Sequence, residues 1–440
     1  MSEIRTSVAA LVIVAFVSGI AWPQAESGKA AEALLARFAE YQEQQRTSGA
    51  LALELRAAQE RYLEARATLR GFRAGKSKAK LKAARVQIDA LEAELVASRR
   101  AYEDQARGDL GRRYRARKAE LDSTLRSLAA GVGKLLRAQD DLRLRRVRAA
   151  LFVDKGHFSL AERDLAKVLA KNADDAVALT LRGRCREAKG LTGEALADYR
   201  RTLELEPSDE RRLRGAVAAF WMNEFTLARQ LRDEVKSLTG QTAQLQVDYG
   251  WYLKKPLLEE AEKRWKREQA FRAADEKRGD LPRIELKTTR GVIVLELFED
   301  QAPNTVANFV ELVEGGFYDG LPWHRVQPLR LAASGKPKEG KKDPAGPGYS
   351  IEGEARLGHA RHHFRGSVGC LIRGPGRRGG SQFYLLLRPD SDLDGQCTVF
   401  GRIVEGVAVL ARLGQDDLLE RARVTRKRDH PYKSKKVPLR

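Results

Sequence analysis

Two short stretches of the sequence carry side chains whose types and spacing could do chemistry. The segment Gly316–Val326 reads GFYDGLPWHRV and combines a turn, aromatic side chains and one arginine, Arg325. A guanidinium stays charged and presents several donors in a fixed plane. The second stretch places His359, His362 and His363 in an HxxHH pattern that could bind a metal, although loop histidines of this kind are more often solvated. We therefore favour the first stretch as the functional site and predict no metal.

The cysteines give a weaker signal. Cys185, Cys370 and Cys397 are the three cysteines among 440 residues. An odd count argues against a disulfide framework, even in an oxidising compartment. A bridge between Cys370 and Cys397 is an open alternative, but nothing in the sequence favours it over two buried free thiols.

Length and charge bound the organisation of the chain. A chain of 440 residues is expected to form two or three folded units, and a hydrophobic content of 42% is enough for real cores. The net charge is +21, and residues 421–440 hold nine Lys or Arg against one acid, which predicts a solvated basic tail. No zinc spacing, RNA-binding signature or helix-turn-helix pattern accompanies this charge, so we predict no specific nucleic-acid ligand.

The segment 1–25 reads as a signal peptide. Arg5 precedes the apolar run Val8–Trp22, which is too short to span a bilayer comfortably. Cleavage after Ala21 fits the preference for small residues, and cleavage after Ala25 is the alternative. We therefore expect an exported protein, periplasmic or secreted. An uncleaved membrane anchor is the other possibility, and only then would a membrane be a partner.

Residues 26–145 predict a long helical hairpin or coiled coil. No proline occurs between Pro23 and Pro207, which permits long helices. Two narrow apolar stripes have helical spacing, and the Gly- and Lys-rich segment 71–80 between them suits a solvated turn. The stripes are Ala84, Ile88, Leu91, Leu95 and Ser98, and Leu121, Leu125, Leu128, Val132 and Leu135.

Residues 146–276 contain an internal period. The segment Ala176–Asp209 forms one period and carries small residues, an aromatic and a terminal proline at regular places: Gly183, Gly190, Ala195, Tyr199 and Pro207. This pattern resembles a tetratricopeptide repeat. One period earlier Gly156, Ala161 and Leu165 are in step, and one period later Asn223, Ala228 and Leu231 are out of register by about one residue.

Such repeats bury their apolar faces against neighbouring helices. We therefore expect the helix at Tyr249–Ala274, with Trp251 and Trp265, to cap the array. The resemblance implies a surface that could bind a protein partner, and a purely structural solenoid is the alternative.

The character of the sequence changes at residues 277–282, which we interpret as a linker. Ten of the 14 prolines follow it. Alternating apolar residues on both sides of Thr288–Gly291 predict a β-hairpin with Ile284 and Leu286 on one strand and Val292, Val294, Glu296 and Phe298 on the other. Thr305–Glu314 predicts a helix with one apolar face, formed by Val306, Phe309, Val310 and Val313.

Six motifs follow the linker in a fixed order: APNTVANFVELVEGGFYDG (302–320), LPWHRV (321–326), GPGYSIEGE (346–354), RGSVG (365–369), GSQFYLLL (380–387) and LDGQCTVFGRIVEG (393–406). Together they resemble the cyclophilin family of peptidyl-prolyl cis-trans isomerases over about residues 283–413. The resemblance implies a closed, eight-stranded antiparallel β-barrel with capping helices, for which we set the bounds 283–420. The whole chain is then multidomain, with an all-α N-terminal part before this domain.

The resemblance also implies a reaction. Rotation about an X-Pro amide is slow because its C–N bond has partial double-bond character. An enzyme can favour the twisted state with a donor to the prolyl nitrogen and a pocket for the ring, without a cofactor. In the family an arginine at the position of Arg325 is that donor, and Gln382 and Tyr384 match residues that line the site. Phe383 we assign to the core instead.

The remaining site residues depart from the family pattern. Where the family carries a phenylalanine, a methionine and a glutamine, this sequence has Arg330, Leu331 and Ala333. Asp392 and Cys397 replace an aromatic and a histidine, whereas Leu393 is retained. The segment before SQF contains Ile372 and Arg373 and ends in further arginines. We therefore include Leu331, Leu393, Arg330, Ile372 and Arg373 among the expected substrate-binding residues and expect a more basic groove.

Two functions follow from this reading. The first is an exported peptidyl-prolyl isomerase that assists protein folding, acts on proline-containing polypeptides, and has reduced activity because part of the pocket is substituted. The second is a non-catalytic peptide-binding or scaffolding protein that uses the altered barrel and the helical repeats. The added arginines suggest acidic substrates in either case.

Overall fold

The computed structural model describes residues 36–38, 40, 41, 93, 97, 108–138, 140–237, 245, 253–336, 347–371 and 378–438. The expected signal peptide, the segment 71–80 and the first apolar stripe lie outside these residues, as does Trp251. Within the described part of the chain, no helix has the length and apolar composition needed to cross a membrane.

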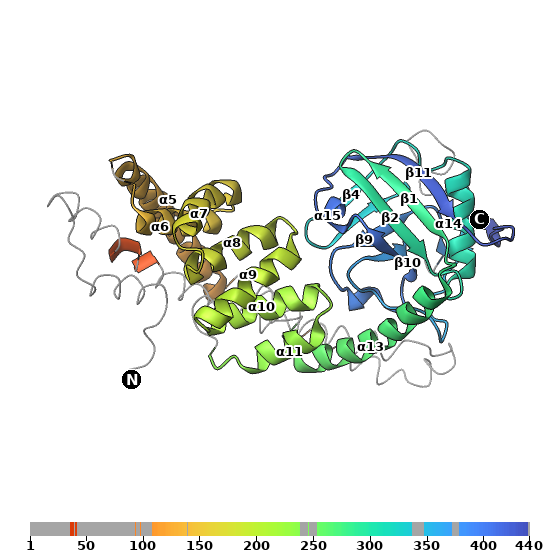
Figure 1. Ribbon diagram of the computed structural model, residues 1–440, viewed down its shortest axis with the longest axis horizontal. Helices are drawn as coiled ribbons and strands as arrows, with labels where there is room; N and C mark the ends of the chain where they lie inside the picture. Colours follow the sequence, from red (N-terminus) through yellow and green to blue (C-terminus); the bar gives the residue numbers. More distant parts are fainter. Residues whose placement is uncertain are drawn as a thin grey trace. The chain divides into compact units, whose positions relative to one another are not determined.

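The described chain begins with helices and ends with β-structure (Figure 1). The helices before the sheet are α5 (Asp109–Ala138), α6 (Leu142–Asp154), α7 (Phe158–Lys171), α8 (Ala176–Ala188), α9 (Thr192–Leu205), α10 (Asp209–Trp221), α11 (Phe225–Asp233) and α13 (Lys255–Arg278). The chain divides into two compact units. The described residues within 1–182, 199–214 and 234–251 belong to one unit, and those within 183–198, 215–233 and 252–440 belong to the other.

Helix α5 in the first unit contains the second predicted apolar stripe. Leu125, Leu128 and Val132 are buried, and Leu135 packs against the same cluster. Their partners are residues of α6, Leu144, Val147 and Leu151. The carboxylate of Asp141 caps α6 by accepting hydrogen bonds from two backbone N–H groups. The described part of the predicted coiled-coil region is therefore helical and packs with its apolar stripe inward.

Helices α6 to α11 repeat with the predicted period. The starts of α6 and α8 are as far apart in the sequence as those of α7 and α9, and this interval equals the length of the segment 176–209. From α8 to α10 and from α9 to α11 the interval is shorter by one position.

The turns between these helices share a backbone conformation. Gly156, Gly190 and Asn223 all have φ between 66° and 76°. Glycine favours this left-handed region, and asparagine tolerates it. The small offset predicted for the third repeat is therefore present in the helix spacing; whether these helices form a tetratricopeptide solenoid stays a prediction.

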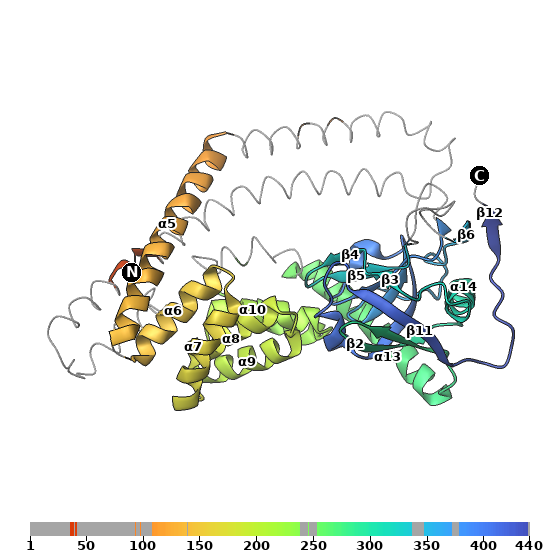
Figure 2. The ribbon, with the colours of Figure 1, turned by 90° about the horizontal axis from the view of Figure 1, so that it is seen from above.

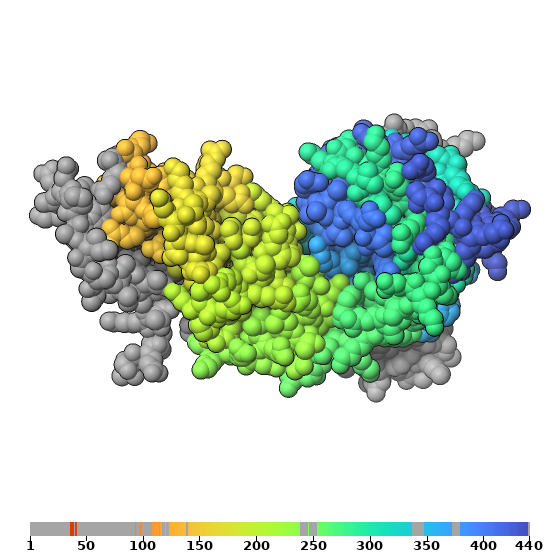
Figure 3. All heavy atoms as spheres, in the orientation of Figure 1, coloured from red at the N-terminus to blue at the C-terminus, as the bar shows by residue number. Residues whose placement is uncertain are grey.

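Helix α13 belongs to the second unit and packs on both α11 and the β-sheet domain (Figure 3). It ends at Gly279, which caps the helix with φ of 66°. Trp265 lies 4.8 Å from the ring of Phe364 and 6.2 Å from that of Phe225, centroid to centroid. The helix that we expected to cap the repeats is thus also joined to the domain that follows it.

A buried ion pair completes this junction. The side chain of Arg361 is fully buried and binds Asp275 and Glu268 of α13, whose side chains are 2% and 4% exposed. Its guanidinium also lies 3.7 Å from the centroid of the Phe298 ring. Because each of these charges is out of water, each depends on the others.

The sheet domain contains a nine-stranded antiparallel sheet with the order β3-β11-β1-β2-β10-β7-β9-β5-β4 and a three-stranded sheet, β12-β6-β8. The strands are β1 (Arg283–Thr288), β2 (Gly291–Leu297), β3 (Leu321–Pro322), β4 (Arg325–Gln327), β5 (Leu331–Ser334), β6 (Tyr349–Glu352), β7 (Ser367–Cys370), β8 (Arg378–Gly379), β9 (Phe383–Leu386), β10 (Thr398–Glu405), β11 (Leu418–Arg426) and β12 (Lys436–Pro438). A cyclophilin-like sheet is therefore present, but the exact closure of eight strands into a barrel is not confirmed.

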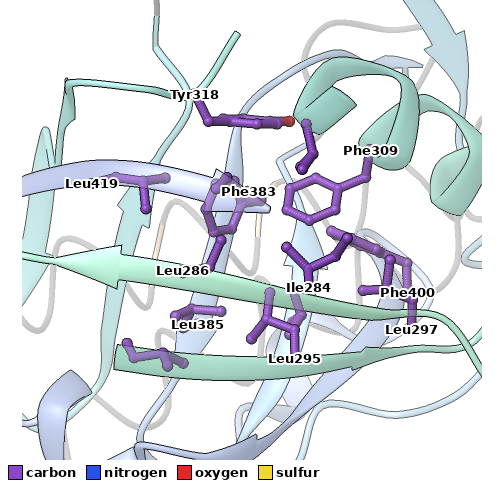
Figure 4. Close-up of a cluster of buried hydrophobic side chains, with 14 of the residues drawn as sticks. Ile284, Leu286, Leu295, Leu297, Phe309, Tyr318, Phe383, Leu385, Phe400 and Leu419 are labelled. Carbon is purple, nitrogen blue, oxygen red and sulfur yellow. The ribbon is translucent and has the colours of Figure 1, made fainter. Parts of the chain in front are cut away.

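The core of this domain lies between the sheet and helix α14 (Pro303–Glu314). Val306, Phe309, Val310 and Val313 are all buried, as their spacing predicted. Phe383 is 1% exposed and packs edge-on against Phe309, which confirms its assignment to the core (Figure 4).

The predicted β1–β2 hairpin is present, and Thr288 pairs with Gly291. However, the core residues of β2 are Ile293, Leu295 and Leu297, not the alternate set that begins at Val292, which is 43% exposed. The second strand carries apolar residues at both alternating sets of positions, so the alternation predicted the hairpin but did not identify the core face. Its buried Glu296 is bound by Arg283, Arg402 and Arg426, so even a charged residue is buried in that set.

Residues 421–438, expected to be a solvated tail, are folded. Residues up to Arg426 belong to β11 and pair with β1, and β12 pairs with β6 (Figure 2). Arg428 forms ion pairs with Asp280 and Asp300, and hydrogen bonds to these carboxylates raise the pKa of Arg428 above its ordinary value. The basic residues are ordered because acids from distant segments lie opposite them.

Candidate active site

Arg325 lies in a row of side chains on adjacent strands. It pairs with Ala333 between β4 and β5, and Ala333 pairs with Tyr384 between β5 and β9. Directly opposite residues of antiparallel strands project to the same face of a sheet. Their sequence neighbours Ala332, Phe383 and Leu385 belong to the core on the other face. The row therefore lies on the face of the sheet directed away from the core, as expected for a groove outside the barrel.

The Arg325 side chain is exposed, and no described residue forms a hydrogen bond or an ion pair with its guanidinium. This differs from the other arginines discussed above, which bind carboxylates. A charged fork of donors that is directed to solvent at the edge of an apolar cluster is available to a ligand. The predicted catalytic residue is therefore exposed, and its role in catalysis stays a prediction.

A glycine allows the Tyr384 ring to lie close to the sheet. Tyr384 pairs with Gly369 of β7, and a Cβ added at Gly369 would lie 2.2 Å from a ring atom of Tyr384. No side chain larger than hydrogen fits there without displacing the ring. Tyr384 is 1% exposed, so it is a buried support for the groove and not an open wall.

Several predicted site residues meet around this ring. Leu331, Ala333, Tyr384 and Leu386 form one buried cluster, against which Leu371, Leu393 and Cys397 pack. The retained Leu393 and three of the substituted positions, Leu331, Ala333 and Cys397, are therefore neighbours in space. Apart from the tyrosine hydroxyl and the thiol, the cluster is apolar, and Ala333 of the cluster lies opposite Arg325 in the strand register.

Arg330 does not leave a free positive charge in this region. Its Nη2 and Nε lie 2.7 and 2.8 Å from Oδ2 of Asp390, and its Nη1 lies 3.4 Å from Oε1 of Gln327. The Asp390 side chain is 8% exposed. Neutralisation by this buried partner reduces the basic character that the sequence suggested for the groove.

The other predicted residues have different placements. Gln382 is 4% exposed, and its backbone carbonyl accepts a hydrogen bond from the N–H of Leu371. Ile372 and Arg373 lie outside the described residues. Asp392 is exposed, in a 3-10 turn at Ser391–Leu393, and its carbonyl accepts a hydrogen bond from Gln396.

Sequence reasoning missed a polar chain beneath Tyr384. The tyrosine oxygen lies 2.7 Å from Nε2 of His363, and Nδ1 of His363 lies 2.8 Å from Oδ1 of Asp394. Nδ1 of His362 lies 3.1 Å from the other oxygen of Asp394. His363 is 2% exposed, so the expectation of a solvated histidine was wrong for this residue. The adjacent histidines were visible in the sequence, but their carboxylate partner is distant in the chain.

The protonation of these hydrogen-bonded side chains follows from burial and from their hydrogen bonds. Burial acts to raise the pKa of Asp394, but hydrogen bonds from His362 and His363 outweigh it and lower that pKa well below the ordinary value. An ionised carboxylate only accepts, so Nδ1 of each histidine carries a proton. In the neutral ring Nε2 of His363 then accepts, and Tyr384 donates. Burial raises the pKa of Tyr384 well above its ordinary value, which keeps the phenol protonated.

None of the three described cysteines forms a disulfide: Cys185 and Cys370 are buried, and Cys397 is partly buried. Burial raises the pKa of Cys370 to about 12, so its thiol is protonated at neutral pH. Among the described residues no group of three or more His, Cys, Asp or Glu is arranged to hold a metal ion. His362 and His363 instead bind one carboxylate.

Comparison with known proteins agrees with this geometry. The family described as "Cyclophilin type peptidyl-prolyl cis-trans isomerase/CLD" matches residues 283–436. A peptidyl-prolyl cis-trans isomerase of Helicobacter pylori is 42% identical over 31% of this chain and 82% of its own length. Peptidyl-prolyl cis-trans isomerase B of Bacillus subtilis is 37% identical over 30% of this chain and 90% of its own.

A solved cyclophilin type peptidyl-prolyl cis-trans isomerase of Cryptosporidium parvum aligns with 34% of this chain and 99% of its own at 19% identity, with a TM-score of 0.30. The identities with the bacterial relatives, over nearly their whole lengths, are high enough to assign the family. The chain belongs to the cyclophilin family, and its C-terminal domain is a cyclophilin-type peptidyl-prolyl cis-trans isomerase.

Proposed function

We propose that this chain accelerates cis-trans exchange of X-Pro bonds in exported polypeptides, with Arg325 as the donor that favours the twisted amide. The observation that carries the proposal is the exposed Arg325 guanidinium, to which no described residue binds, in one row with Ala333 and Tyr384. We place the prolyl ring against the apolar cluster next to Arg325.

The chemistry requires only binding and electrostatics. In the twisted state the prolyl nitrogen loses conjugation and becomes a better hydrogen-bond acceptor. A donor that is stronger toward this state than toward the planar amide lowers the barrier. Arg325 suits this role because its charge is not already neutralised by an acid of the described chain.

We further propose that the rate is lower than in a typical member of the family. Ala333, opposite Arg325 in the strand register, has no polar group to hold the guanidinium. A shift of a catalytic group by about 1 Å can reduce the rate by about a hundredfold. Arg330, bound to Asp390, also replaces an apolar wall by a charged pair.

Exchange spectroscopy on a proline peptide with the full chain tests the proposal. We expect catalysed exchange in the wild type and a loss of about a hundredfold in kcat/KM for Arg325→Ala, the effect of removing one preorganised donor. Arg356→Ala is the matched control, because Arg356 is an exposed arginine of the same domain that bonds to the carbonyl of Gly395. Absence of acceleration by the wild type at high enzyme concentration would refute the proposal.

The second candidate is a peptide-binding or scaffolding protein without catalysis. It is favoured by Ala333 and by the Arg330–Asp390 pair, since both remove features that the family uses around the arginine. Peptide binding that is equal in the wild type and in Arg325→Ala, without exchange, would support it. Binding that is insensitive to salt would argue against acidic peptides as ligands.

The proposal also covers the export of the protein and the role of its helical part. The expected signal peptide, residues 1–25, supports export, with membrane anchoring as the alternative if it is not cleaved. The regular spacing of the helix starts supports tetratricopeptide-like repeats that bind a protein partner. N-terminal sequencing of the purified protein and affinity measurements with a helical fragment test these two points.

A further inference from the structure

Asp394 connects four donors from two separate segments. Its Oδ1 accepts from the backbone N–H and from Nδ1 of His363, at 2.9 and 2.8 Å. Its Oδ2 accepts from Nδ1 of His362 at 3.1 Å and from Nη1 of Arg264 at 2.8 Å. Arg264 belongs to helix α13, so this carboxylate joins the helix to the loop that carries the two histidines.

The chain of bonds continues to the groove. His363 connects Asp394 to the hydroxyl of Tyr384 by hydrogen bonds. The rings of His363 and Tyr384 are stacked with 17° between their planes. Tyr384 lies opposite Ala333, and Ala333 lies opposite Arg325. Every side-chain contact from Arg264 to Tyr384 is therefore a hydrogen bond or an ion pair, and the last two steps to Arg325 are adjacent strands of one sheet.

The backbone of His363 fixes the same loop from its other side. Its carbonyl accepts from the N–H of Asp390 at 3.0 Å, and the carboxylate of Asp390 binds Arg330. The His363 ring can therefore neither rotate nor retreat without breaking bonds on both sides. Because its side chain is fully buried, water cannot replace those bonds.

We propose that Arg264, Asp394 and His363 are positioning residues that hold the Tyr384 ring under the groove, so that helix α13 is part of the machinery that places Arg325 and the prolyl ring. This inference rests on the proposed isomerase function. We call the series of bonds from Arg264 through Asp394 and His363 to Tyr384 the relay. The relay acts on the tyrosine hydroxyl, since the ring itself has no other polar atom.

A double-mutant cycle on the full chain tests the last step of the relay. Tyr384→Phe removes only the hydroxyl, and His363→Asn keeps a side-chain amide near Asp394 but cannot reach the hydroxyl. We expect each single change to lower kcat/KM by about fivefold. If the histidine acts through the hydroxyl, the double variant also loses about fivefold, whereas independent effects would give about twenty-fivefold.

A second pair of variants tests the helix. Arg264→Gln removes the bond to Asp394, and Arg267→Gln is its matched control, because Arg267 also belongs to α13 and bonds to the domain, at the carbonyl of Gly358. We expect a loss of two- to threefold in kcat/KM for the first variant and none for the second. Both arginines are partly or largely exposed, so neither change is expected to prevent folding.

Nitrogen-15 chemical shifts of the histidine rings report the hydrogen bond itself, which a change in packing alone would not alter. The wild type should show His363 protonated at Nδ1, and Tyr384→Phe should shift its Nε2 resonance while the exposed His359 is unchanged. Additive losses in the cycle, equal effects of the two α13 variants, or an unshifted His363 in Tyr384→Phe would each overturn the relay.

The experiments distinguish an error in the proposed isomerase function from an error in the proposed relay. If the wild type shows no exchange, the proposed function is wrong, and the same cycle is then measured on the dissociation constant of a proline peptide. Coupled losses of affinity would support the relay without catalysis, and additive losses or none would overturn it.

Discussion

Two arginines of the same domain illustrate opposite uses of one side chain. Arg361 is fully buried between Glu268 and Asp275 and lies against the Phe298 ring. Arg325 is exposed, and its guanidinium has no bond to any described residue. The buried arginine is a structural link that gives two carboxylates of α13 their fully buried partner, whereas the exposed one has no bond that holds the described fold together. Exposure and missing partners, not charge, therefore mark the arginine that can serve a ligand.

The free energy of unfolding gives one scale for this comparison, and the largest effect is expected at the buried arginine. Arg361→Ala should lower the free energy of unfolding by about 3 to 5 kcal/mol, because two buried carboxylates lose their fully buried partner and keep only the more exposed Arg272 and Arg278. Urea denaturation of the full chain measures it. Arg356→Ala, at an exposed arginine, should stay within about 0.5 kcal/mol. A loss below about 1 kcal/mol in Arg361→Ala would remove the contrast between the two arginines.

The next effect concerns the groove itself. Gly369→Ala should cost about 1 to 3 kcal/mol, because the new methyl group would overlap the Tyr384 ring, which is already packed in a cluster. It should also reduce exchange activity by displacing that ring. Gly358→Ala is the matched control, since no atom lies within 4 Å of the position of its Cβ. Equal stability of the two variants would show that the ring moves without cost.

A smaller effect should depend on pH. The pKa of Asp394 is lowered in the folded chain, so its stabilising contribution is present above its unfolded pKa, near 4, and is lost as the pH falls further. Asp394→Asn should therefore be less stable than the wild type by about 2 kcal/mol at pH 7. The difference should shrink as the pH is lowered below about 4. Denaturation at several pH values checks the sign.

Asp416→Asn provides the control for this pH series. Asp416 is exposed, and it has no described side-chain partner. Its substitution should leave the stability and its pH dependence nearly unchanged. A difference between wild type and Asp394→Asn that grows as the pH falls would contradict the assignment of an ionised Asp394.

The smallest stability effect is expected at the functional arginine. Arg325→Ala should leave the free energy of unfolding within about 0.5 kcal/mol, although we expect it to have the largest effect on exchange activity. Thermal and urea denaturation of the purified variant test this. A clear loss of stability would mean that Arg325 has a structural partner and would weaken its assignment as a donor to substrate.

What the sequence could predict follows from the range of the interactions. The face of α14 and the core position of Phe383 were predictable, because periodicity and short motifs are local signals. Leu331 and Leu393, which the family pattern assigns to the same site as Tyr384, lie in one cluster with it, since that pattern carries the distant pairings of strands.

The features that escaped prediction all need partners far apart in the chain. The carboxylate of Asp394 lies 31 residues from His363, and those of α13 lie 86 and 93 residues from Arg361. The folding of residues 421–438 likewise depends on β1 and on Asp280 and Asp300. A charged side chain in a sequence looks the same whether it meets water or a distant acid, so composition predicted a solvated tail.

The junction at Arg361 also sets the boundary at which this domain could be separated from the rest of the chain. The similarity to the family begins at residue 283, but a piece cut there would lack Glu268, Asp275 and Trp265. It would keep a buried cation without counter-charges and expose one face of Phe364. We therefore expect the smallest stable piece of this chain that contains the catalytic domain to include α13.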